Sequence, residues 1–197
     1  MTGARRGGRP PLISRDDVVA AAIAIIDAEG LDALTMRGIG ARLGVAAMSL
    51  YRHLPNRDAV LAAVVNRLVT EVVVDVPADA RWPDALRALA LGYREMLLRH
   101  PHAVPLLATQ PVDVDTGMAL AAPALDRSRA AGIGADDAVT AVQSVIVFVL
   151  GHALAQVGTP PGADDAPPAA PAGYYDRWFT AGLDAMIHGF TRTGDGP

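Results

Sequence analysis

The chain has 197 residues, which is enough for one domain with a sizeable core or for a small domain joined to a larger one. It contains no cysteine, and this excludes disulfide bonds, thiolate metal sites and cysteine nucleophiles. Residues 1–68 carry nine arginines against six acidic residues, whereas the remainder carries eight arginines against fifteen acidic residues. The protein is therefore acidic overall and basic at its front.

Residues 1–13 are predicted to form a flexible basic arm. Arg5, Arg6 and Arg9 stand among glycines and prolines, and the stretch has no apolar run, so it fits neither a signal peptide nor a helix. By itself, such an arm is as compatible with a solvated tail as with a binding element.

Capping signals predict two short helices after the arm. Ser14 is expected to begin the first helix, with Asp17 completing a capping box, and Gly30 is expected to end it. A second helix is expected to begin at Thr35 and to end at Leu43. Apolar residues at helical spacing give each helix one face that can be buried.

A glycine turn follows the second helix. Gly44 can adopt the left-handed conformation that ends a helix. A third helix of about seven residues is expected in "AAMSLYRH", before Pro55 ends it and Asn56 begins a fourth helix. Three short helices with a glycine turn between the last two predict a helix-turn-helix, whose third helix is placed to enter a DNA major groove.

The stretches "LTMRGIGARLGV" and "SLYRHLPNRDAVL" carry a more specific signal. Residues 14–61, in which both lie, resemble the DNA-binding domain of the TetR family of bacterial transcriptional regulators. The resemblance implies phosphate contacts by one set of residues, namely Thr35, Tyr51, His53 and Arg57. It also implies that a second set faces base edges, namely Ala47, Met48, Ser49 and Arg52, with Arg37 as a further candidate for base contact. In this context we expect the arginines of the arm to follow phosphates or to enter the minor groove.

Each of these residues also has a purely structural interpretation. Leu50 and Tyr51 could belong to the core of a small bundle, and His53 could interact with a helix C-terminus. Arg57 stands at a helix start, where the helix dipole disfavours a cation, so a purely structural role is less expected there. Gly40 departs from the alanine that is usual in the family, and it is expected to weaken the second helix by roughly 1 kcal/mol.

The rest of the chain, residues 62–197, is predicted to be a helical domain for ligand binding and dimerisation. The fourth helix is expected to continue towards Val74, and Pro123 is expected to kink or interrupt a later helix. The proline-rich and glycine-rich stretch 158–172 predicts a mobile loop. The further helices are expected at residues 84–99, 113–131, 137–157 and about 174–192.

The helix expected at residues 137–157 is apolar nearly all round. About 20 residues is the minimum length for a membrane span, but the polar residues in it and the lack of flanking arginines argue against a membrane. A helix buried on every side needs neighbours, and a partner subunit would supply them. TetR-type regulators dimerise through the last two long helices of each subunit, so Val145 and Phe148 are expected at a subunit interface.

The sequence lacks the signatures of an enzyme, since it has no P-loop, nucleophile elbow, dinucleotide fingerprint or paired-carboxylate motif. His100 and His102 could approach one metal ion, but no acidic residue lies near them in sequence, so ordinary surface or core histidines are favoured. We therefore predict no catalysis and no cofactor.

The predicted protein is an all-α homodimeric repressor of the cytoplasm, released from a DNA operator by a small, mostly apolar ligand. Two alternatives stay open: a constitutive dimeric DNA-binding protein, and a helical small-molecule-binding domain with vestigial DNA binding. Aromatic, methionine and polar residues of the second domain are candidates for a ligand pocket. They are Trp82, Tyr93, Met96, His100, Met118, Gln143, Phe148 and His152.

Overall fold

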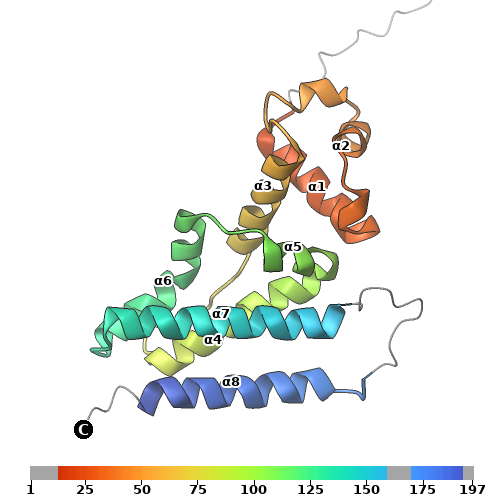
Figure 1. The fold of residues 1–197 in the computed structure, drawn as a ribbon. Coiled ribbons are helices and arrows are strands. Elements are labelled where there is room, and N and C mark those ends of the chain that lie inside the picture. The colour runs from red at the N-terminus through yellow and green to blue at the C-terminus, as the bar shows by residue number, and fades with distance from the viewer. Residues whose placement is uncertain (1–12, 159–169, 193–197) are drawn as a thin grey trace, which may run out of the picture.

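The computed structural model describes residues 13–158 and 170–192, and within these ranges the secondary structure is helical, as predicted. Figure 1 shows two parts, which we call the head and the body. The head comprises α1 (Arg15–Glu29), α2 (Met36–Leu43) and α3 (Arg57–Thr70). The predicted arginines of the arm and most of the predicted mobile loop lie outside the described residues.

The first helix of the head begins and ends where the capping signals place it. The Asp17 amide donates to Ser14 Oγ over 3.1 Å, and the Ser14 amide donates to Asp17 Oδ2 over 2.8 Å, which completes the capping box. The hydrogen bonds that the Ser14 amide and hydroxyl donate to Asp17 Oδ2 hold the pKa of this carboxyl below its ordinary value. Gly30 ends the helix with a φ of 86°. The prediction for α1 is confirmed.

The turn after α2 depends on two glycines. Thr35 Oγ1 accepts from the Gly38 amide over 3.0 Å at the start of α2, and Gly44 is left-handed with φ 68° and ψ 28°. A Cβ at Gly40 would lie 2.9 Å from Val45 O, so the chain returns against α2 more closely than a side chain there would allow. The expectation that Gly40 merely weakens α2 is therefore incomplete, because the glycine makes room for the turn.

The segment after this turn is not the predicted helix of about seven residues. A 3₁₀ turn spans Ala47–Ser49, and residues 50–53 continue as a hydrogen-bonded turn. The Ser49 amide donates to Ala46 O over 2.8 Å, and the His53 amide donates to Leu50 O over 2.8 Å. Ala46 stands at the N-cap position and offers no side-chain acceptor, so this segment lacks the side-chain cap that begins α1, α2 and α3.

The body comprises the five later α-helices, joined to the head by residues 71–81, which we call the linker. α3 ends at Thr70, earlier than the predicted Val74, because the linker turns to pack on α4 (Trp82–Arg99). A Cβ at Gly92 of α4 would overlap Val73 O, which shows how closely the linker lies on that helix. The helices are α4 (Trp82–Arg99), α5 (Val104–Thr109), α6 (Val114–Ala130), α7 (Ala135–Val157) and α8 (Tyr174–Arg192).

α6 passes through Pro123 without interruption. The proline removes one backbone donor, but Leu120, Ala121 and Ala124 around it are buried in the body. Packing on both sides of Pro123 thus retains the helix, so the predicted interruption is absent, and the alternative that Pro123 kinks α6 stays a prediction.

α7 has one buried face and one exposed face. By length and composition alone it could cross a membrane, but it packs within the body on α4, α5, α6 and α8. Val145 is fully buried inside its own chain, and the Phe148 ring lies 5.7 Å from the Phe179 ring of α8. The expectation that Val145 lies at a subunit interface is wrong, because the chain's own helices already cover it. Val147, 68% exposed, lies on the uncovered face.

Candidate DNA-binding surface and ligand pocket

The turn at residues 47–53 has large side chains exposed to solvent, and buried leucines anchor it to the head. Leu50 and Leu54 are buried in the head, which confirms the structural interpretation of Leu50. Met48 is 77% exposed and Tyr51 is 42% exposed, and Arg52 is exposed beside them. The turn is at the end of the head that lies away from α7 and α8 (Figure 1). Its exposed side chains are therefore free to meet a large partner.

The remaining residues predicted to contact bases differ in exposure. Ala47 and Ser49 are half-buried, and Arg37 is exposed on α2. Arg52 Nε donates to Ser49 O over 3.3 Å, which leaves the other guanidinium donors of Arg52 available. Base contacts by these residues stay a prediction.

The residues predicted to contact phosphates include two with structural partners. The Thr35 side chain caps α2, as described above. Arg57 donates from Nε to Leu34 O over 3.0 Å and from a terminal nitrogen to Leu31 O over 3.1 Å. The guanidinium thus ties the start of α3 to the segment after α1, a structural role that the helix-dipole argument disfavoured. A phosphate contact by Arg57 stays a prediction.

His53 is the most enclosed member of the same predicted set. It is half-buried, and its Nε2 has no hydrogen-bond partner among the described residues. The histidine therefore has an unused polar atom close to the exposed turn.

His100 joins the head to the body. Its Nδ1 lies 3.0 Å from both carboxylate oxygens of Asp27 in α1, and its Nε2 lies 3.8 Å from Glu71 Oε2. Glu71 also pairs with Arg67 Nε over 3.0 Å. Nδ1 of His102 lies 3.0 Å from Asp27 O. Both histidines, which the sequence offered as a weak metal pair, thus contact the end of α1.

The residues predicted to form a ligand pocket differ in burial within the part of the chain that the structure describes. Tyr93 and Met96 are buried in α4, and burial raises the pKa of Tyr93 to about 12. Met118 and Gln143 are exposed on α6 and α7. Their role in ligand binding stays a prediction.

His152 lies in an aromatic cluster between α7 and α8 and is 3% exposed. Its ring centroid is 4.7 Å from that of Trp178 and 5.2 Å from that of Phe179. Neither ring nitrogen has a hydrogen-bond partner among the described residues. Burial, and then the positive charge of Arg94, hold the pKa of His152 below its ordinary value of 6.5.

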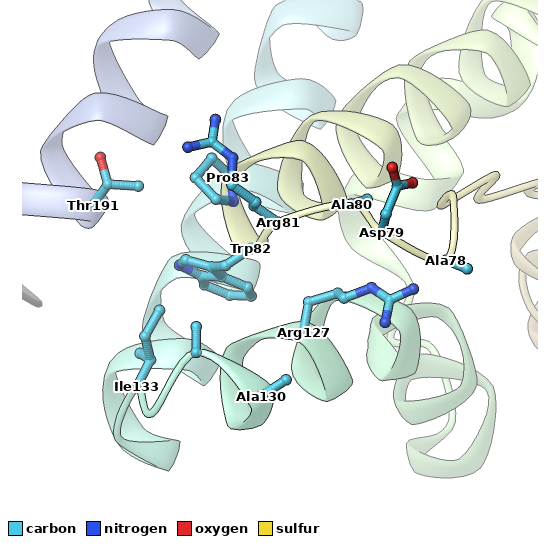
Figure 2. A pocket seen from close by; sticks show the side chains of 11 residues that line it. Ala78, Asp79, Ala80, Arg81, Trp82, Pro83, Arg127, Ala130, Ile133 and Thr191 are labelled. Atoms are coloured by element: carbon cyan, nitrogen blue, oxygen red, sulfur yellow. The ribbon is translucent and has the colours of Figure 1, made fainter.

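Figure 2 shows a pocket of about 540 Å³ where the start of α4, the end of α6 and the end of α8 meet. Of the eight predicted ligand residues, Trp82 alone lines it, and its wall also includes Ile133. Arg127 lines the pocket as well, and sequence analysis missed it. No local pattern could have identified Arg127, because it reaches the pocket only when α6 packs beside the linker.

Two family models match most of the chain. Residues 18–64 match the model for bacterial regulatory proteins of the tetR family. Residues 76–172 match the model for the tetracyclin repressor-like C-terminal domain. The chain belongs to the TetR family. The turn at residues 47–53 is thus the surface of a TetR-type helix-turn-helix domain, and the 540 Å³ pocket lies in a TetR-type C-terminal domain.

Individual TetR-family relatives agree with this assignment. The HTH-type transcriptional repressor DrrR1 of Streptomyces coeruleorubidus is 33% identical over 159 residues, which are 79% of this chain and 58% of that protein. The chain spans about three fifths of the length of the first curated relatives that it matches.

Solved structures of the TetR family have the same fold. The Streptomyces coelicolor protein ActR in complex with (S)-DNPA matches with a TM-score of 0.76 at 28% identity, over 94% of this chain and 100% of that chain. BioQ, solved with its double-stranded DNA operator, matches with a TM-score of 0.69 at 26% identity, over 90% of this chain and 98% of that chain.

Proposed function

We propose that this TetR-family chain is a transcriptional repressor that binds a palindromic DNA operator as a homodimer and is released by a small molecule. The observation that carries the proposal is the exposure of Met48, Tyr51 and Arg52 on a turn that buried Leu50 and Leu54 hold in place. Exposed apolar and cationic groups on a short, fixed segment suit a DNA groove. BioQ, which has the same fold and was solved with its double-stranded DNA operator, supports DNA binding by this chain.

The side chains of the turn have different expected roles. Arg52 can donate two hydrogen bonds to a guanine, and Met48 can contact a thymine methyl. Tyr51 and the arginines of the arm are expected at phosphates, which position the protein without reading sequence. Sequence preference therefore rests mainly on Arg52, with Ser49 and Arg37 as further candidates.

A homodimer is supported by the outward face of α7 and α8. Val139, Val147 and Leu154 are exposed on α7, and Trp178 is exposed on α8. The three α7 residues are seven or eight positions apart, so they share one side of the helix. An apolar stripe of this kind favours a second copy of the same helix pair. Two half-sites one helical turn apart then require both subunits.

Release by a small molecule is supported by the 540 Å³ pocket, whose volume is in the range of ordinary ligand sites. A constitutive DNA-binding protein is the second candidate. It is favoured by the burial of Tyr93, Met96 and Phe179, which fill the space between α4, α7 and α8. In either case we propose a cytoplasmic protein without enzymatic activity.

The proposal is tested by selecting fragments of the source genome on the purified full chain and measuring their affinity at several salt concentrations. We expect a palindromic fragment bound by two subunits, with log K falling linearly as log salt rises. A chain that binds no fragment even at low salt would leave the helical small-molecule-binding domain as the better account.

A further inference from the structure

The pocket between α4, α6 and α8 combines an aromatic wall with an arginine that is incompletely hydrogen-bonded. Trp82 and Ile133 supply apolar surface, and the Arg127 side chain lies on the other side of Trp82 from Ile133, with its guanidinium pointing towards the linker (Figure 2). We propose that this pocket binds an aromatic carboxylate, and that the carboxylate draws Arg127 away from the linker. The inference deepens the proposed function, on which its regulatory part rests, by naming the chemical class of the ligand.

Arg127 is held by one weak acceptor. A terminal nitrogen donates to Pro77 O of the linker over 2.9 Å, and Nε is buried without a partner among the described residues. A guanidinium has five N–H donors, so most of its capacity is unused. A carboxylate accepts two parallel bonds from this fork and binds it more strongly than a neutral carbonyl does. An anion in the pocket would therefore compete with Pro77 O.

The charges around the pocket leave Arg127 as the group that an anion would meet. Arg81, also in the wall, lies 3.6 Å from Asp84 Oδ2 and is already paired. Asp79 lines the pocket mouth, but its carboxylate and the Arg127 guanidinium point in different directions, and no ion pair joins them (Figure 2). Of the two arginines in the wall, Arg127 thus has no carboxylate partner.

The contact with Pro77 connects the pocket to the head. The linker leads directly from α3, whose first residue, Arg57, is bonded to the segment after α1. Pro77 O also accepts from the Ala80 amide over 3.0 Å. When Arg127 leaves Pro77, the linker loses its bond to α6, and α3 is freer to change its angle. By linkage, an anion that prefers the loosened linker must bind less well to the operator-bound protein.

The binding part of the proposal is tested without DNA. In W178F, Trp82 is the remaining tryptophan, so its fluorescence reports on the pocket. The probes are 2-naphthoate and 2-naphthamide, which share their rings and differ in charge. We expect 2-naphthoate to quench Trp82 and to bind at least about tenfold more tightly than the amide.

Substitution of Arg127 makes the test specific. R127Q in the W178F background is expected to lose the preference for the acid. R129Q is the matched control, because Arg129 lies on the same helix and pairs with Asp126 over 2.9 Å at the surface. Equal binding of acid and amide, an absence of quenching, or an unchanged preference in R127Q would overturn the proposal.

The linker part has its own readout in amide hydrogen exchange. With 2-naphthoate, and in R127Q without it, we expect faster exchange of the linker amides, including that of Ala80. Unchanged hydrogen exchange of the linker amides would overturn the proposal that the carboxylate releases the linker from Arg127. Both readouts are independent of DNA, so a failure of operator binding would be recognised separately as a failure of the proposed function.

Discussion

The head and the body hold their polar side chains by different means. In the head, Ser14, Thr35 and Asn56 each accept a hydrogen bond from a backbone amide three residues later. In the body and at its junction, the partners are far apart in sequence: Arg94 and Asp176 by 82 residues, His100 and Asp27 by 73, and Arg127 and Pro77 by 50. Local caps thus mark the helix starts of the head, where Arg57 adds a contact with Leu34, 23 residues away. The body also has local pairs, such as Arg129 with Asp126, but the contacts that join its helices to one another exist only once those helices have packed.

The largest expected effect comes from a charge on the buried face of α7, compared with a charge on its exposed face. V145E places a charge at a site with no exposure and should lower the free energy of unfolding by about 3 kcal/mol or more, measured by urea denaturation. V147E, two residues away at an exposed site, should leave the chain folded but convert dimers to monomers in sedimentation. A V147E protein that stays dimeric would place the interface elsewhere.

A smaller effect is expected at the junction between head and body. H100A removes the contacts with Asp27 and Glu71 and should lower the free energy of local opening of α1 by about 1–3 kcal/mol. Native-state hydrogen exchange of the α1 amides measures this opening. H188A, which truncates an exposed histidine of α8, is the control. Equal exchange in the two variants would mean that His100 does not couple the two parts.

Within the head, G40A compares two opposing effects at position 40. Alanine stabilises the helix, but its side chain crowds the turn. Alanine favours a helix by about 1 kcal/mol, but its Cβ would lie 2.9 Å from Val45 O. Overpacking against backbone costs about 1–3 kcal/mol, so we expect a net loss of up to about 2 kcal/mol. A more stable G40A, measured by thermal unfolding, would show that the turn relaxes readily.

The smallest expected effect is on the pH dependence of the free energy of unfolding, through His152 in the body. Because burial lowers the pKa of His152 in the folded state, the unfolded chain takes up its proton first as pH falls through 6.5. The free energy of unfolding should therefore decrease from about pH 7 to about pH 5, and H152F should show a smaller decrease. An identical pH dependence in H152F and the parent protein would show that His152 does not contribute.

These differences explain how much the sequence could predict. Cap residues and Gly44 act within a few positions, so the bounds of α1 and α2 were predicted within a residue or two. The segment predicted as a third helix begins instead with a 3₁₀ turn at Ala47–Ser49, and no cap residue at Ala46 marks a helix start there. The positions of His100 and Arg127 follow from packing between distant segments, which periodicity does not encode. Sequence therefore indicated the DNA-binding surface far better than the pocket.

The most direct test of the account compares R52A and Y51F on the selected operator and on random DNA. R52A should weaken operator binding by about 1–3 kcal/mol and random DNA much less, because a base contact carries sequence preference. Y51F should weaken both kinds of DNA nearly equally, because a phosphate contact does not. R129A, the same change at an arginine of the body, should leave both affinities unchanged. Equal losses on operator and random DNA for R52A would contradict the assignment of the exposed turn as the surface that reads DNA sequence.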